Sequence, residues 1–311
     1  MYFHAINMMM ELLLKEAQQG NRKSLARLIS SVENETEGYI KLLQHLPINS
    51  KVPVIGITGP PGAGKSTLIN ALLKKITEDQ PSASIAVLAV DPSSPFNRGA
   101  LLGDRLRMNE HFNNPNIYIR SLATRGALGG LSARSVEVTD VLRSSGFDYI
   151  LIETVGVGQS EVDIVSLADI TIVVFVPESG DEIQTIKSGI MEIADIFVVN
   201  KADRDGAGIM MKNLFNTLHE RPASLTSVDV VKTIATTGEG VDELYVAIQK
   251  QRHHLPEKRK ALLSQQAYRL IQHYRMKDIT IDKLNDALKE ISGTEDFNIY
   301  SFVEKYVNNK I

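Results

Sequence analysis

An eight-residue segment near position 60 constrains this chain more than any other part of its sequence. It fits the pattern G-x-x-x-x-G-K-[ST] at every position, with Gly59, Pro60, Pro61, Gly62, Ala63, Gly64, Lys65 and Ser66. An apolar run, 52–58, precedes the segment, and a helix-like stretch, 67–77, follows it. A strand, a glycine-rich loop and a helix in this order are typical of a loop whose backbone N–H groups bind phosphate. The helix N-terminus adds favourable potential for an anion, so the sequence predicts a nucleotide phosphate site.

Two side chains of this segment have specific expected roles. Lys65 should contact the β- and γ-phosphates and act in catalysis, and the Ser66 hydroxyl should ligate Mg²⁺. Thr67, which begins the predicted helix, completes the expected phosphate-binding set. The alternative is a glycine-rich turn without a ligand, and the complete match to the pattern argues against it.

From residue 52 onward, short apolar runs alternate with longer amphipathic segments. Seven runs have the length and composition of strands: 52–58, 85–91, 116–123, 148–156, 170–176, 196–200 and 231–236. Several are apolar without interruption, as strands buried on both faces should be. The helical segments between them favour an α/β fold in which helices cover both faces of a mostly parallel sheet. Together with the phosphate loop, this pattern predicts the P-loop NTPase fold.

Helical segments flank this region on both sides. An apolar stripe at helical spacing runs through the first part of the chain, and the strands stop after Pro256. We predict an N-terminal helical extension at 1–46, a P-loop domain at 47–255 and a C-terminal helical extension at 256–311. The C-terminal extension should pack on the domain or on a second copy of the chain.

Composition excludes several classes of protein. The chain has 311 residues, of which 34 are lysine or arginine and 37 are aspartate or glutamate, for a formal net charge of −3. A dedicated nucleic-acid binder usually carries a basic excess. The absence of cysteine excludes disulfides and thiolate metal sites. No stretch has the ~18 apolar residues of a membrane span, and the N-terminus lacks a signal-peptide pattern. We therefore expect a cytoplasmic protein with no membrane or nucleic-acid partner.

A second motif, Asn200-Lys201-Ala202-Asp203, follows a predicted strand. Asp203 can accept hydrogen bonds from the N1–H and N2 amine of guanine, whereas adenine has no donor at those positions. A carboxylate left unpaired by the wrong base discriminates strongly. The Lys201 stem can lie along the base, Asn200 can tie this loop to the phosphate loop, and the Ala235 amide can donate to guanine O6. These residues favour GTP over ATP.

Three acidic residues fall where a nucleotide-bound Mg²⁺ would need oxygen ligands. Asp91 and Glu153 each end a predicted strand, and Asp104 lies in the loop between those strands. Carboxyl ends of parallel strands share one edge of a sheet, so Asp91 and Glu153 should lie near the phosphate loop. Alternatively, Asp91 belongs to an Asp-Pro turn and Asp104 caps a helix. Glu153 would be costly to bury without a cation, and we expect it to act in catalysis.

The residues after Glu153 suggest how hydrolysis is arranged. The Gly156 amide can meet the γ-phosphate, and Gln159 can orient the attacking water, as glutamine does in other GTPases. A solvent-exposed glutamine is the alternative. Several loop arginines can stabilise developing phosphate charge or can simply be solvated: Arg98, Arg105, Arg107, Arg125 and Arg134.

The chain resembles the MeaB-type GTPases, which are methylmalonyl-CoA mutase-associated proteins once labelled arginine/ornithine transport kinases. The resemblance rests, in order, on GPPGAGKST, DPSSPFNRGALLGDRLRM, RGALGG, ETVGVGQSEVD, VPESGDEIQTIKSGIMEIAD and NKAD. It covers roughly residues 20–260. In these GTPases the third motif begins with glutamate, which Glu153 matches.

The resemblance implies a homodimeric, Mg²⁺-dependent GTPase that converts GTP and water to GDP and phosphate. In that family the GTPase cycle gates the loading of adenosylcobalamin onto an acyl-CoA mutase and protects the mutase from inactivation. The residues that the resemblance assigns to the Mg²⁺ shell are Ser66, Asp91, Asp104 and Glu153. Those assigned to an additional switch loop that contacts the mutase are Glu178, Asp181, Glu182 and Lys187. The chain departs from the family at Arg98-Gly99, where two small residues are usual.

Three other functions fit part of the sequence. A nickel- or cobalt-delivering GTPase would need clustered imidazole or thiolate ligands, but cysteine is absent and the seven histidines are scattered apart from His253-His254. A kinase for the binding protein of a transport system would need an acceptor site and a base, which no motif marks. A non-enzymatic interaction module explains the helical flanks but not the Mg²⁺ carboxylates.

Overall fold

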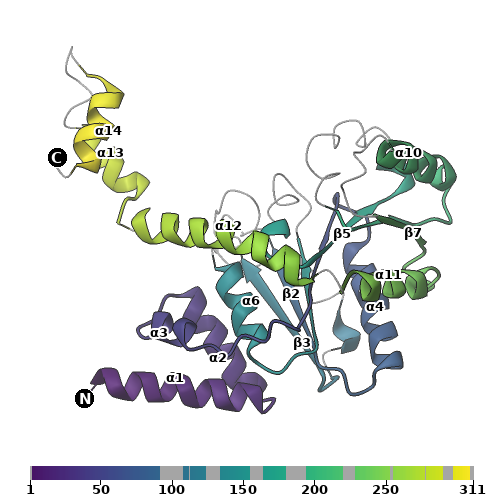
Figure 1. The fold of residues 1–311 in the computed structure, drawn as a ribbon, viewed down its shortest axis with the longest axis horizontal. Helices are drawn as coiled ribbons and strands as arrows, with labels where there is room; N and C mark the ends of the chain where they lie inside the picture. The colour runs from purple at the N-terminus through teal and green to yellow at the C-terminus, as the bar shows by residue number, and fades with distance from the viewer. Residues whose placement is uncertain are drawn as a thin grey trace. The chain divides into compact units, whose positions relative to one another are not determined.

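The computed structural model describes most of the chain (Figure 1). The residues described are 2–91, 108–111, 113–123, 134–154, 164–179, 194–219, 228–252, 255–276, 278–289 and 297–308. The chain divides into two units, residues 1–260 and residues 261–311. Within the described ranges, no helix has the length and apolar character needed to cross a membrane.

Seven strands form one sheet in the first unit, in the order β3-β2-β4-β1-β5-β6-β7. The strands are β1 (Val54–Thr58), β2 (Ile85–Asp91), β3 (Ile117–Ala123), β4 (Tyr149–Glu153), β5 (Ile170–Phe175), β6 (Ile196–Asn200) and β7 (Asp229–Thr233). Every neighbouring pair is parallel, so all seven carboxyl ends share one edge, where α/β sheets bind ligands. The predicted α/β fold with a parallel sheet is confirmed.

Helices cover both faces of this sheet (Figure 1). They are α1 (Tyr2–Gln18), α2 (Arg22–Glu33), α3 (Tyr39–Gln44), α4 (Lys65–Asp79), α6 (Ser135–Arg143), α10 (Ala207–His219) and α11 (Val241–Gln251), with the 3₁₀ helices η1 (Asn109–His111), η2 (Ile164–Ser166) and η3 (Pro177–Ser179). On one face, α4 and α11 pack on Ile57 and Leu151. On the other face, α1, α2 and α6 pack on Ile152, and α10 packs on the stacked rings of Phe175 and Phe197. Alternate residues of one strand thus enter opposite cores.

The N-terminal helices share the core of the sheet. The apolar stripe of α2 has no exposed surface at Leu25, Leu28, Ile29 and Val32. Asn21 starts this helix, because its side-chain oxygen accepts hydrogen bonds from the amides of Lys23 and Ser24, which would otherwise lack partners in the first turn. The stripe in the sequence therefore packs inside the first unit.

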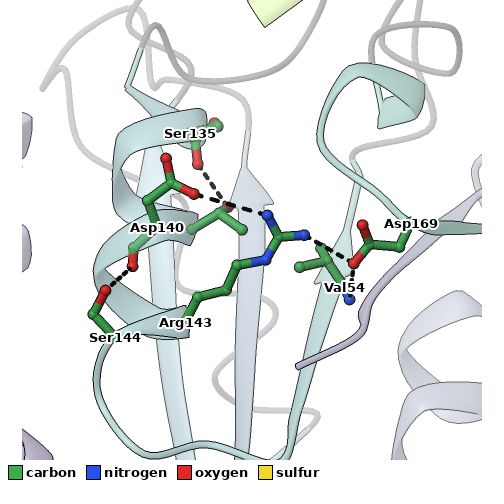
Figure 2. Close-up of polar contacts among 7 residues, drawn as sticks. Val54, Ser135, Asp140, Arg143, Ser144 and Asp169 are labelled. Carbon is green, nitrogen blue, oxygen red and sulfur yellow. Dashed lines mark hydrogen bonds and ion pairs between the residues drawn. The ribbon is translucent and has the colours of Figure 1, made fainter. Parts of the chain in front are cut away.

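A buried ion pair fixes α6 against the amino-terminal edge of the sheet (Figure 2). The Arg143 guanidinium donates to Oδ2 of Asp169 at 2.8 Å, and the amide of Val54 donates to the same oxygen at 2.8 Å. Asp140 lies on the other side of the guanidinium, with 3.8 Å between the charged atoms. Asp169 precedes β5 and Val54 begins β1, so one carboxylate connects a helix to two strands.

The second unit is helical and has little core of its own. Its elements are the greater part of α12 (Leu255–Met276), α13 (Ile281–Lys289) and α14 (Ile299–Val307). Among the residues of 261–311 that the structure describes, Phe302 alone is a buried apolar side chain. Large apolar side chains are exposed at Leu263, Tyr268, Ile271, Tyr274, Met276, Ile281, Ile299, Tyr300, Val303 and Val307. Exposed apolar surface on this scale is typical of an interface.

Candidate functional site

The glycine-rich loop leaves β1 at the carboxyl edge of the sheet and enters α4. Gly59 has a φ of 138°, and a Cβ there would lie 2.1 Å from the carbonyl oxygen of Val174. Gly64 has a φ of 86° and caps α4, and a Cβ there would lie 2.5 Å from Nδ2 of Asn200. Residues other than glycine are disfavoured at such φ values and would clash, so this path requires glycine at both positions.

The Lys65 side chain folds back over the loop that precedes it. Its Nζ donates to the carbonyl oxygens of Gly59 at 2.8 Å and of Pro60 at 3.1 Å, and the side chain is buried. The ammonium group therefore lies within the loop whose amides are predicted to bind phosphate. Elsewhere in the loop and at the start of α4, Ala63 is buried. Pro60, Gly64 and Thr67 are half-buried, and Pro61 and Gly62 are exposed.

Ser66 and Glu153 meet although 87 positions separate them in the sequence. Ser66 Oγ, in the first turn of α4, donates to Oε1 of Glu153, at the end of β4, over 2.7 Å. Only 3% of Ser66 and 5% of Glu153 is exposed. A hydroxyl and a carboxylate are the oxygen donors that Mg²⁺ prefers, so this pair fits the predicted metal site.

The other two predicted metal ligands are only partly visible. Asp91 ends β2, which pairs with β4 in parallel, so its backbone lies at the same edge of the sheet as Glu153. The side chain of Asp91 and the whole of Asp104 lie outside the described residues. Among the described side chains, no three carboxylate or imidazole groups gather in a way that would hold a metal ion.

Asn200 connects three segments at the carboxyl edge. Its Nδ2 donates to the carbonyl oxygen of Ala63 in the phosphate loop at 2.8 Å. Its Oδ1 accepts from the hydroxyl of Thr233 and from the amide of Ala235, each at 3.1 Å. The predicted tie between the base loop and the phosphate loop therefore exists in the structure. Thr233 has no signature in the sequence, because a threonine at the end of a strand is common.

Lys201 and Asp203 of the base motif differ in their surroundings. Lys201 has a φ of 55°, unusual for a residue with a side chain, and its Nζ donates to the carbonyl oxygen of Gly62 at 2.7 Å. Asp203 is exposed, and Ala235 is buried, with 8% of its surface accessible. A second link thus joins the base motif to the phosphate loop, while the carboxylate predicted to bind guanine remains accessible.

The described end of the predicted partner loop lies next to the base motif. Glu178, in η3, forms an exposed ion pair with Arg204, the residue after Asp203. The hydrogen bond from Arg204 lowers the pKa of Glu178 below its ordinary value. The two loops are thereby in contact at their surfaces, although a pair this exposed contributes little stability.

Several predicted residues lie outside the described part of the chain: Gly156, Gln159, Asp181, Glu182 and Lys187. Of the five loop arginines, only Arg134 is described. It is buried and pairs with Glu35 and Glu137, so its charge is neutralised by carboxylates of the N-terminal segment and of α6.

A family model described as methylmalonyl Co-A mutase-associated GTPase MeaB matches residues 25–292. The chain belongs to the MeaB family. It is accordingly a P-loop GTPase, and the predicted family and enzyme class are confirmed. Both motifs brought to the carboxyl edge, the phosphate loop and the base motif, lie within the matched residues.

Individual relatives agree with membership of the MeaB family. A Pyrococcus horikoshii protein named "Putative GTPase" is 46% identical over 250 residues, which cover 79% of this chain and 78% of that protein. A protein of Geobacillus kaustophilus named fused isobutyryl-CoA mutase is 35% identical over 250 residues, covering 76% of this chain and 23% of that protein. The crystal structure of a LAO/AO transport system kinase is 24% identical, with a TM-score of 0.67 over 96% of each chain, and shows the shared fold.

Proposed function

We propose that this GTPase is a chaperone of an adenosylcobalamin-dependent acyl-CoA mutase, whose cofactor loading it gates and which it protects from inactivation. The observation that carries the proposal is the Geobacillus relative, in which a segment similar to this chain makes up part of a fused isobutyryl-CoA mutase. The family description, which names a mutase-associated GTPase, supports the same partner class. A segment fused to a mutase in one organism is expected to bind a separate mutase in another.

The candidate site offers residues for each step of a GTPase cycle. The backbone N–H groups of residues 59–66 other than the two prolines, together with the Lys65 ammonium, would hold the phosphates. Asn200 and Asp203 would hold guanine, and the Ala235 amide, which donates to Asn200 Oδ1 in the structure, would turn to guanine O6. Ser66 and Glu153, with Asp91 and Asp104, would hold Mg²⁺, which would neutralise negative charge on the phosphates. Gly156 would sense the γ-phosphate and Gln159 would orient the attacking water.

Partner contacts would come from two places. The loop from Glu178 to Lys187 would contact the mutase, and the pair between Glu178 and Arg204 supports this, because it joins that loop to the base motif. Residues 256–311 would form the dimer interface, supported by the exposed apolar side chains of the second unit. The GTPase domain would then comprise residues 47–255, and the N-terminal helical extension would comprise residues 1–46.

Affinity capture from the native extract tests the proposal. The tagged full-length chain is loaded with GTP or with GDP, and the recovered proteins are identified. We expect a cobalamin-dependent mutase whose recovery differs between the two nucleotides. Recovery of hydrogenase or urease components instead would favour metal delivery, and transfer of label from γ-labelled GTP to protein would favour a kinase; either result contradicts the proposal.

A further inference from the structure

Two buried threonine hydroxyls meet at the carboxyl edge on the side of the sheet away from α4. The Thr154 hydroxyl donates to Oγ1 of Thr58 at 2.8 Å, across 96 positions of sequence. Thr58 has no exposed surface and Thr154 is 1% exposed. Thr58 is the last residue of β1, immediately before the phosphate loop, and Thr154 immediately follows Glu153. Thr154 lies within the segment ETVGVGQSEVD, but the sequence assigns no role to either hydroxyl.

The strand register shows why this pair matters for Glu153. Ile57 of β1 pairs with Glu153 of β4, and the Thr154 amide continues the ladder by donating to the Ile57 carbonyl oxygen at 3.1 Å. Successive residues of a strand point to opposite faces, so Glu153 meets Ser66 on the α4 side while Thr154 meets Thr58 on the other side. The end of β4 is therefore held from both faces of the sheet.

Packing alone does not explain threonine at these positions. Valine has the same shape and suits a buried strand at least as well, whereas an unpaired buried hydroxyl costs free energy. The hydrogen bond from the Thr154 hydroxyl to Thr58 Oγ1 gives a directional link that valine cannot give. Departures from the simplest buried sequence are expected where function requires them.

We propose that Thr58 and Thr154 are positioning residues for GTP hydrolysis. Their hydrogen bond fixes the end of β4 relative to the root of the phosphate loop, and so holds the Glu153 carboxylate at the Ser66 hydroxyl. Neither threonine contacts the reacting atoms; each acts through Glu153. The inference rests on the proposed role of Glu153 in the metal site.

The test compares Thr58→Val, Thr154→Val and the double variant in steady-state GTP hydrolysis at varied GTP and Mg²⁺ concentrations. Each valine should lower kcat about tenfold, raise the Mg²⁺ concentration needed for half-maximal rate, and change KM for GTP less than about threefold. The double variant should be no slower than the slower single one, because both changes remove the same bond. Thr58→Ser should restore the rate, since it keeps the hydroxyl.

Thr139→Val is the matched control, because the Thr139 hydroxyl is equally buried but bonds within α6, to the carbonyl oxygen of Ser135 at 2.7 Å. It should leave kcat and the Mg²⁺ dependence unchanged, and unfolding temperatures measured on the same samples exclude a general loss of structure. Normal kcat in both valine variants, or losses that multiply in the double variant, would overturn the inference. Glu153→Gln distinguishes failure of the proposed metal site from failure of the threonine inference. Wild-type activity in Glu153→Gln refutes the metal site itself, whatever the threonine variants show.

Discussion

The side-chain amide of Asn200 donates to the carbonyl oxygen of Ala63 at 2.8 Å, and so joins the base motif to the phosphate loop across 137 positions of sequence. The same side chain accepts from Thr233 and Ala235. One buried residue therefore fixes the distance between the two halves of the nucleotide site. Any nucleotide that spans both halves depends on this distance.

Asn200→Ala should weaken GDP binding about tenfold or more and destabilise the fold by about 2–3 kcal/mol, because it leaves several buried polar groups unpaired. Titration with a fluorescent GDP analogue and urea unfolding measure the two effects. Asn213→Ala, at an exposed position on α10, serves as the control and should change neither. Normal GDP affinity in Asn200→Ala would show that the link does not organise the site.

Asp203→Asn tests the assignment of the base. The substitution replaces one acceptor oxygen with a donor, so the exposed side chain would face the N1–H and N2 amine of guanine with a mismatched group. We expect GTP affinity to fall about 100-fold or more while xanthosine triphosphate binds at least as well as GTP does, because two charge-assisted hydrogen bonds are affected. Competition between the two nucleotides measures the change. Unaltered preference for GTP would show that Asp203 does not read the base.

Two kinds of feature in the site could be predicted from the sequence: contiguous motifs, and the approach of Ser66 to Glu153 and of Asn200 to the phosphate loop, because the carboxyl ends of parallel strands share one edge. The phosphate loop and the base motif each lie within one segment, and their positions after β1 and β6 follow from the period of the strands. The contacts of Asn200 with Thr233, and of Thr154 with Thr58, depend on which strands become neighbours. Strand order is set by packing across the whole sheet, so a linear pattern does not reveal such pairs.

The ion pair between Arg143 and Asp169 should contribute strongly to stability (Figure 2). Asp169 is 1% exposed and Arg143 is 9% exposed, so Asp169→Asn would remove the carboxylate that lies 2.8 Å from a buried guanidinium and leave Asp140 at 3.8 Å. We expect a loss of about 3–5 kcal/mol in the free energy of unfolding, measured by urea denaturation. Arg143→Met combined with Asp169→Asn should cost less than Asp169→Asn alone, since it removes both charges of the pair and keeps an oxygen that can accept from the Val54 amide; a larger cost would contradict this account.

His111 should make stability depend on pH. Burial lowers its pKa below the ordinary value, and this outweighs the attraction of Glu110 and a hydrogen bond with the backbone of Asn70. At pH above about 6.5 the imidazole is neutral in both states and carries no penalty. As the pH falls below that value, the unfolded chain takes up the proton more readily, so stability is lost. Unfolding temperatures between pH 7.5 and 5.5 should fall less for His111→Asn than for the parent; parallel curves would contradict the assignment.

The second unit should be stabilised by a second copy of the chain. Ile281 and Tyr300 are 77% and 81% exposed, and helices that bury so little apolar surface cannot offset the entropy of ordering their residues. Ile281→Glu combined with Tyr300→Glu should convert a dimer into a monomer in sedimentation velocity, because each charge would have to be buried at the interface. Ile209→Glu, at a position 69% exposed on α10, should leave the dimer intact. A parent chain that sediments as a monomer at micromolar concentration would refute the interface, whereas a dimer that survives the double substitution would place it elsewhere.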